Sequence, residues 1–302
     1  MNTTNPKISS STSVHQMLLD MPKENPGKFT VVGTIAVPNW GGINDISNHF
    51  QGIAPLNGVV AITGQISASA SSWWCASFVE SGDPATVTAV FGTGYYDHAG
   101  GIQRLGDLLP VPLENDRGEA TVAFYDVRTS SPQLLYEVHL GGKASAVAIT
   151  NYRDSAGVEQ AMLLIYRYDP KSFYAYRAPV DKLGDKESPW EFIKETRNIE
   201  HEDDDQYQCF ALVTEQTSSG DRVVLLGFRE DEEVVRYYVE TGSSTFGDIS
   251  VIQWTYVDWS GSQWRNGVGL QICSPTKIRL FGCDADPKGD SDDYEFPIYY
   301  WG

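Results

Sequence analysis

The chain has 302 residues and a formal net charge of −18, because 40 Asp and Glu residues face 22 Lys and Arg residues. An acid excess of this size repels the phosphates of nucleic acids and the headgroups of anionic lipids, and no stretch approaches the ~18 apolar residues of a membrane span. We therefore expect a soluble protein that has neither a nucleic acid nor a membrane as its partner.

Residues 1–28 differ in composition from the rest, because they are rich in Asn, Ser, Thr and Pro and contain one short apolar patch at 17–21. This composition predicts either a flexible tail or a strap across one face of the protein. The segment has no charged start followed by ~7 to 15 apolar residues, so we expect a cytoplasmic protein or one exported without a conventional signal peptide. Residues 29–302 are expected to form a single domain.

The chain repeats itself. With an offset of 49 residues and no gap, residues 49–63 and 98–112 share the pattern His-x-x-Gly-Ile-x-x-Leu, followed after two residues by an apolar strand. Three weaker copies align on a small residue followed by an apolar one, at Ala146-Val147, Cys209-Phe210 and Gly267-Val268. A period of ~40 to 50 residues that is rich in short strands is typical of the blades of a β-propeller.

Each copy continues in the same order, with segments that are rich in β-branched and aromatic residues. The second strands are predicted at 59–62, 108–113, 161–166, 222–228 and 277–282. The third strands are predicted at 73–79, 121–127, 172–177, 233–239 and 295–301, and the fourth at 86–91, 134–140, 190–194 and 249–254. The last copy lacks a fourth strand, and residues 29–37 read as a strand that belongs to no copy.

These elements predict an all-β fold, a five-bladed β-propeller with four-stranded blades, in which the strand at 29–37 closes the ring. Small residues at the start of every proposed inner strand support this fold, since only small side chains let five inner strands crowd around one axis. A β-sandwich is the alternative, because it also has alternating strands and frequent turns. A sandwich, however, gives no reason for the 49-residue offset.

Two phrases, His98-Ala-Gly-Gly-Ile-Gln103 and Gly142-Lys143-Ala-Ser-Ala-Val-Ala-Ile149, look like segments of uncharacterised bacterial propeller proteins. Together with the repeat, they give residues 29–302 a resemblance to the five-bladed β-propeller superfamily, and to no characterised family within it. Five-bladed propellers include sugar-binding lectins, glycoside hydrolases and cyclases. The resemblance therefore implies a fold and does not decide the function.

Candidate functional residues lie where the loops lead into the inner strands, because a propeller brings these positions to one mouth of its channel. The candidates for catalysis are His49, Asp97 and His98. The candidates for ligand binding are Gln51, Gln103, Lys143, Gln208, Trp264, Arg265 and Asn266. Two roles are open for His49 and His98. In the structural role, each caps the end of its blade by hydrogen bonding to loop carbonyls. In the functional role, the imidazoles bind a metal or act as acid and base.

A second candidate site is an acidic loop with the spacing of a calcium loop. Oxygen ligands would come from Asp284, Asp286, Asp290, Asp292 and Glu295, with Gly289 at the sharp turn. Against calcium, Lys288 places a cation at a ligand position, and the flanking segments read as strands and not as helices. The alternative is a solvated hairpin loop. Apart from calcium, we expect no cofactor.

Two functions follow from these residues. The first is a ligand-binding or interaction propeller with one polar site at the channel mouth, for a glycan or a small molecule. The second is an enzyme, a hydrolase, lyase or cyclase, with an axial His and Asp site that a metal assists. Because the polar residues differ from copy to copy, we expect one site on the axis and not five around the rim. We also expect the protein to be a monomer.

Overall fold

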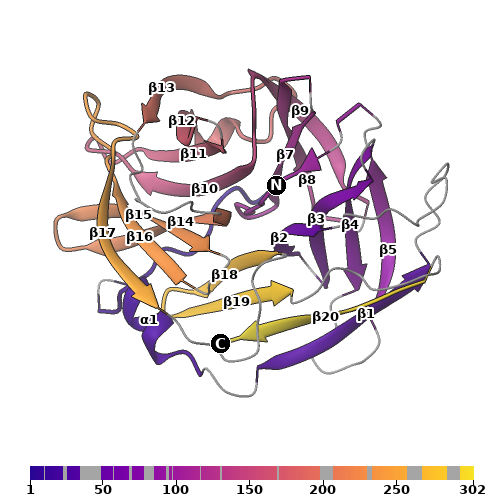
Figure 1. Ribbon diagram of the computed structural model, residues 1–302. Coiled ribbons are helices and arrows are strands. Elements are labelled where there is room, and N and C mark those ends of the chain that lie inside the picture. Colours follow the sequence, from indigo (N-terminus) through magenta and orange to yellow (C-terminus); the bar gives the residue numbers. More distant parts are fainter. Residues whose placement is uncertain are drawn as a thin grey trace.

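A computed structural model describes most of the chain. The described residues are 1–9, 11–22, 26–34, 49–56, 58–67, 70–77, 85–92, 95–96, 98–115, 117–129, 131–168, 170–197, 207–229, 233–256, 267–283 and 293–302. The strands in these ranges form four sheets arranged around a common centre (Figure 1). The protein is thus all-β and propeller-like, and it is not a two-layer sandwich.

Three of the sheets are four-stranded antiparallel meanders, in which each strand pairs with the next one along the chain. The second copy forms β6 (His98–Ala99), β7 (Leu108–Glu114), β8 (Glu119–Asp126) and β9 (Gln133–Gly141). The third forms β10 (Ala146–Arg153), β11 (Glu159–Arg167), β12 (Ser172–Pro179) and β13 (Glu191–Arg197). The fourth forms β14 (Tyr207–Thr217), β15 (Gly220–Arg229), β16 (Glu233–Val239) and β17 (Ile249–Tyr256).

The remaining sheet is closed, and it has the strand order β1-β20-β19-β18-β2-β3-β4-β5. Its strands from the first copy are β2 (His49–Pro55), β3 (Val59–Ser67), β4 (Ala70–Ser77) and β5 (Ala85–Gly92). Its other strands are β18 (Val268–Ser274), β19 (Lys277–Cys283), β20 (Asp293–Trp301) and β1 (Gly27–Thr34). Parallel pairs join the two groups at both edges, Val268 with Gly52 and Val31 with Ala85.

The prediction of five separate blades is therefore wrong, because the structure has four sheets. The strands expected for the first and last blades occur in the expected order, but they share one sheet. The reason is the pairing at both edges, of β18 with β2 and of β1 with β5, which joins the two groups of strands. Strand propensity is a property of each segment and contains no information on this pairing.

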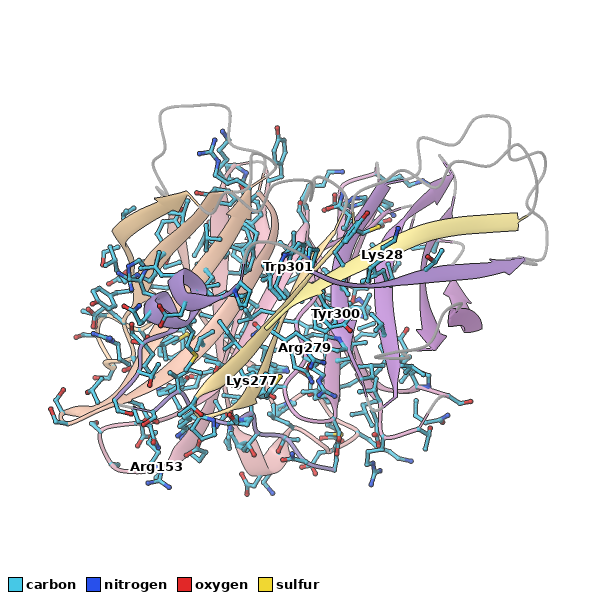
Figure 2. All side chains as sticks on the ribbon, turned by 90° about the horizontal axis from the view of Figure 1, so that it is seen from below. Lys28, Arg153, Lys277, Arg279, Tyr300 and Trp301 are labelled. Carbon is cyan, nitrogen blue, oxygen red and sulfur yellow. The ribbon has the colours of Figure 1, made fainter. Side chains whose placement is uncertain are left out.

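The N-terminal strand pairs with the end of the chain, as the sequence predicts. β1 and β20 are antiparallel from Gly27 with Tyr300 to Thr34 with Asp293. Lys28 Nζ lies 5.7 Å from the centre of the Tyr299 ring, and Arg279 Cζ lies 5.3 Å from the centre of the Tyr300 ring. Figure 2 shows these strands from the side, with Lys28, Arg279, Tyr300 and Trp301 labelled. This pairing covers an edge of β20 that would otherwise expose unpaired backbone groups.

The first strands of the copies approach one another closely, as the small residues predict. A Cβ atom on Gly269 would lie 1.7 Å from the carbonyl oxygen of Ile53, and one on Gly52 would lie 2.5 Å from the backbone nitrogen of Ile102. Both distances are far below van der Waals contact. Glycine is required at these two positions because a larger residue would force neighbouring strands apart.

We call the side on which the inner strands begin the front face and the side on which they end the back face. Residues 1–9 cross the back face, and the N-terminus lies near the centre of the arrangement in Figure 1. Their hydrogen bonds reach three copies of the repeat: Asn2 bonds to Asp107, Asn5 to Asn151 and Ile8 to Thr214, at 2.7, 2.9 and 2.8 Å. Lys7 adds ion pairs to Glu159 at 2.7 Å and Asp221 at 2.6 Å.

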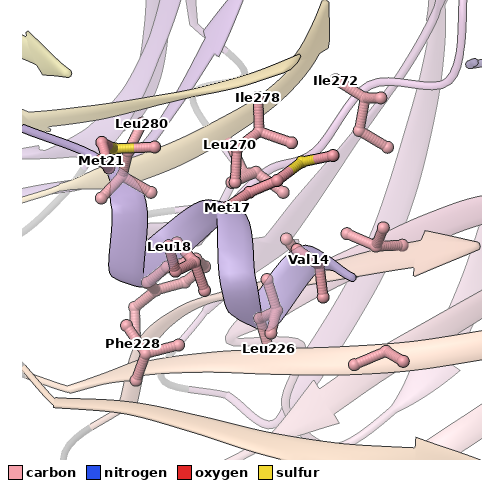
Figure 3. Close-up of a cluster of buried hydrophobic side chains, with 14 of the residues drawn as sticks. Val14, Met17, Leu18, Met21, Leu226, Phe228, Leu270, Ile272, Ile278 and Leu280 are labelled. Carbon is pink, nitrogen blue, oxygen red and sulfur yellow. The ribbon is translucent and has the colours of Figure 1, made fainter. Parts of the chain in front are cut away.

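A short helix, α1 (Val14–Asp20), follows this segment. The Ser13 hydroxyl accepts a hydrogen bond from Gln16 N–H at 3.2 Å, and the Glu215 carboxylate accepts one from Val14 N–H at 2.8 Å. Both acceptors satisfy backbone donors that a helix start leaves unpaired. The apolar side chains of this segment lie at spacings of three and four residues, and they are Val14, Met17, Leu18 and Met21. They face Leu226, Phe228, Leu270 and Leu280 (Figure 3).

The packing of α1 predicts different effects for two adjacent leucines. Leu18 is 2% exposed and Leu19 is 43% exposed. Leu18→Ala should lower the free energy of unfolding by ~2 to 5 kcal/mol, because it leaves a cavity between two sheets. Leu19→Ala is the matched control and should change it by less than ~0.5 kcal/mol. Urea unfolding of both variants measures this, and equal losses would contradict the placement of α1.

Candidate functional site

A histidine and a glutamate form the centre of a polar cluster on the front face. β6 and β7 pair antiparallel with His98 opposite Glu114, which brings the two side chains together. His98 Nδ1 lies 3.2 Å from Glu114 Oε1. Nδ1 itself is buried, whereas 18% of the His98 side chain is exposed, so the exposed part lies on the rest of the residue. The imidazole thus faces a carboxylate through Nδ1, and part of the side chain reaches solvent.

Glu114 is buried at the end of a strand in which every residue is buried, and three further groups surround its carboxylate. Ala144 N–H donates to Oε2 at 2.7 Å, Ser145 Oγ lies 3.4 Å from the same atom, and Lys143 Nζ lies 3.7 Å from Oε1. Burial alone would raise the pKa of Glu114, but His98, Ala144 N–H and Lys143 together hold that pKa below its usual value. Glu114 is therefore ionised at neutral pH.

The cluster continues along the β7–β8 hairpin. Lys143 Nζ donates to the carbonyl of Asn115 at 3.5 Å, and the Asn115 amide donates to Glu119 Oε2 at 3.1 Å. The Tyr95 hydroxyl also donates to Glu119 Oε2. This hydrogen bond raises the pKa of Tyr95 and lowers the pKa of Glu119. A continuous polar network thus runs from His98 to Tyr95.

Close packing of the inner strands places the parts of this network. Gly101 N–H donates to the Ser145 carbonyl at 3.1 Å, and a Cβ atom on Gly100 would lie 2.0 Å from the same oxygen. The connection that carries Lys143 and Ser145 is therefore held directly against the segment that follows His98. Two residues predicted as site residues, His98 and Lys143, are brought into one cluster by this contact.

Gln103, which the sequence predicts as a ligand-binding residue, joins strands together. Its side-chain oxygen accepts hydrogen bonds from Ile149 N–H at 2.9 Å and Leu212 N–H at 2.8 Å, and its side-chain nitrogen donates to the Leu212 carbonyl at 2.8 Å. Three of the four hydrogen-bonding positions of the amide are thus used by the backbone of β10 and β14. The residue is 3% exposed, so in this structure it crosslinks inner strands.

The structure describes only part of the other predicted sites. Gln51 is buried in β2. His49 lies in β2, Gln208 in β14 and Glu295 in β20, and the structure describes their backbone alone. The predicted site residues outside the described ranges are Asp97, Trp264, Arg265, Asn266, Asp284, Asp286, Asp290 and Asp292. A shared site of His49 and His98, and the calcium loop, stay predictions.

Among the described side chains, no group of three or more His, Cys, Asp or Glu residues could hold a metal ion. No helix within the described ranges is long and apolar enough to cross a membrane.

The sequence analysis missed Glu114. The predicted strand ended at Leu113, whereas β7 includes Glu114 as its last residue. A signal was available, because an acidic residue directly follows a continuous apolar run and lies 16 positions after His98. If the two segments pair as a hairpin, this residue can face the histidine. The pairing register, which the sequence does not specify, was needed to show that the two residues are opposite each other.

No family model matches the chain, and no curated protein matches its sequence. Among solved structures, a GH43_1 enzyme from Xanthomonas citri is 9% identical with a TM-score of 0.46, over 85% of this chain and 89% of that one. The catalytic domain of a Coprinopsis cinerea GH62 alpha-L-arabinofuranosidase is 11% identical with a TM-score of 0.45, over 92% and 98%. A periplasmic gluconolactonase from Pseudomonas aeruginosa is 11% identical with a TM-score of 0.38, over 75% and 63%. At such values, function has to be argued from the residues of this chain.

The three side-chain hydrogen bonds of Gln103 predict that its substitution lowers the free energy of unfolding. Gln103→Met keeps the volume and removes all three hydrogen bonds, so it should cost roughly 1 to 3 kcal/mol for each backbone group left unpaired. Gln133→Met, at an exposed position on β9, is the control and should be neutral. Denaturant unfolding checks this. If Gln103→Met were as stable as the control, the crosslink would have no energetic role.

The lowered pKa of Glu114 predicts a pH-dependent contribution to stability. A carboxylate whose pKa is lower in the folded state stabilises the protein above its unfolded pKa, ~4.3, and loses this contribution as the pH falls through the folded value. Glu114→Gln should therefore be less stable than the unchanged protein at pH 7, by ~1 to 3 kcal/mol, and the difference should shrink below pH ~4. Unfolding at several pH values measures this. The exposed Glu187→Gln should give no such difference at any pH.

Proposed function

We propose that the protein is an enzyme that performs acid–base chemistry on a hydroxyl-rich small molecule or glycan at the front face. The observation that carries the proposal is the geometry of His98, whose buried Nδ1 lies 3.2 Å from the buried carboxylate of Glu114 while the side chain keeps a solvent-exposed part. An imidazole held by a carboxylate on one nitrogen has a fixed tautomer and orientation, and its other nitrogen can exchange a proton with a substrate.

In this proposal His98 is the catalytic residue. Its Nε2 atom takes a proton from a substrate hydroxyl or a water molecule and returns it to a leaving group. Glu114 is a positioning residue, whose carboxylate lies 3.2 Å from Nδ1 and stabilises the imidazolium formed in the first step. Lys143, whose side chain is 36% exposed, keeps Glu114 ionised and can donate to a substrate oxygen. Hydrolysis and elimination both fit this set of groups.

A non-catalytic binding propeller is the second candidate. The bonds of Glu114 to Ala144 N–H and Ser145 favour it, because they tie the connection between two sheets and would be needed in a purely structural role. In that case His98 would cap its strand, and the front face would bind a ligand without changing it. The two candidates differ in whether loss of the imidazole removes turnover.

The enzyme proposal predicts that His98→Ala lowers kcat/KM by ~10² to 10⁴ fold, since it removes the general base. Turnover is followed on a panel of aryl glycosides, sugar lactones and oligosaccharides. His139→Ala, which removes an exposed histidine on β9, is the matched control and should keep full activity. If the panel includes a substrate and His98→Ala turns it over as fast as the control, His98 is not the base.

Glu114→Gln tests the positioning role separately. Because Gln carries no charge, the protonated imidazole loses its stabilising anion, and the midpoint of the acid limb of the pH–kcat/KM profile should move to lower pH. A purely structural role for Glu114 would lower activity at every pH and leave the midpoint in place.

A further inference from the structure

Two half-exposed tyrosines lie at the ends of the polar network around Glu114. Tyr95 is 52% exposed and Tyr168 is 51% exposed. The other large apolar side chains that are exposed among the described residues lie on outer strands, on α1 or in the turn between β10 and β11: Leu134, Phe192, Val251, Leu19 and Val158. The two tyrosines differ from these because hydrogen bonds connect both of them to the candidate site.

Tyr95 is held in place although its ring is exposed. Its hydroxyl donates to Glu119, which also accepts from the Asn115 amide at 3.1 Å. Its ring stands at 89° to that of Tyr96, with the ring centres 5.1 Å apart. A ring fixed by a hydrogen bond and an edge contact loses little conformational entropy when a ligand covers it.

Tyr168 approaches the same network from the third copy. Its backbone N–H donates to Ser145 Oγ at 3.4 Å, and Ser145 Oγ lies 3.4 Å from Glu114 Oε2. Its carbonyl accepts from Lys171 N–H at 3.1 Å, and Lys171 has a positive φ of 57°, which is unfavourable for a residue with a side chain. These hydrogen bonds place the backbone of Tyr168 beside the site.

We propose that Tyr95 and Tyr168 are two stacking platforms for one neutral oligosaccharide that crosses the front face over His98 and Glu114. The proposal rests on the acid–base function above and names its substrate class. The flat face of a sugar ring carries C–H groups that pack on an aromatic ring, while its hydroxyls bond to polar groups at the rim. Platforms on two neighbouring sheets with a polar floor between them fit a chain of several sugar rings better than a single sugar.

The charges favour a neutral chain over an acidic one. Glu114 and Glu119 lie in the network between the two platforms, where Lys143 contacts Glu114 and Arg117 lies near Glu119 and Tyr95. The whole chain carries a formal charge of −18. Each of the two carboxylates has a cation near it, so the repulsion of an acidic polysaccharide would come from the overall field of the protein.

Calorimetry tests the proposal with neutral xylo-, cello- and malto-oligosaccharides of one to six units. The unchanged protein should bind at least one series, with affinity that rises with chain length until both platforms are covered. Tyr95→Ala and Tyr168→Ala should each weaken binding of the longest chain roughly tenfold, and the double variant roughly a hundredfold, which corresponds to ~1.4 kcal/mol per platform. Tyr168→Phe keeps the ring and should bind nearly as well, whereas Tyr95→Phe also loses the hydrogen bond to Glu119 that holds its ring and should bind less well than the unchanged protein. If an alanine variant does not fold, Tyr95→Leu and Tyr168→Leu, which lose the flat ring and keep an apolar side chain, should weaken binding as the alanine variants do.

Phe192→Ala is the matched control, because it removes an equally exposed ring from an outer strand. Binding that is unchanged in both tyrosine variants, or no binding of any of the three series, would overturn the proposal. Oligosaccharide binding that depends on both tyrosines, together with turnover that does not depend on His98, would support the platforms and overturn the acid–base function. The two proposals can therefore fail separately.

Discussion

The close approach of the inner strands is the constraint on which the rest of the structure depends. Glycine allows it where backbones nearly touch, as at Gly269 against Ile53, and at the Gly101–Ala146 bridge the neighbouring copies pair directly. Between β10 and β14 the amide of Gln103 bonds to both backbones. Buried backbone donors and acceptors must be paired. The inner strands therefore have to pack closely and form hydrogen bonds to one another at the same time. A bulky residue at the centre would break both.

The polar cluster on the front face is a result of the same packing. Bonding of Gly101 to the Ser145 carbonyl brings the connection at 142–145 against the second sheet, and this places Ala144 N–H at the carboxylate of Glu114. A buried carboxylate is costly unless it is well bonded, and here a backbone donor, an imidazole and an ammonium group offset the cost. The site thus needs no special loop, because the contact that assembles the sheets also assembles the charges.

Much of the fold could be predicted from the sequence, because strand propensity and small residues are local signals. The range predicted at 222–228 lies within β15, and the one at 295–301 lies within β20. α1 was missed although Val14, Met17, Leu18 and Met21 have helical spacing. The joining of two groups of strands into one sheet, the bonding of Gln103 and the pairing of His98 with Glu114 could not be predicted. Each depends on a register or an approach between segments that are far apart in the chain.

The pairing of β1 with β20 has a consequence for how the protein is made. Gly27 lies opposite Tyr300, so β1 leaves the ribosome long before the strand that it pairs with. Contacts between such distant segments form slowly, because a very long loop must close before they contribute any energy. Until β20 is made, the edge of β1 that faces it has no partner, and an unpaired strand edge promotes aggregation. Synthesis of β20 therefore decides when β1 can complete its sheet.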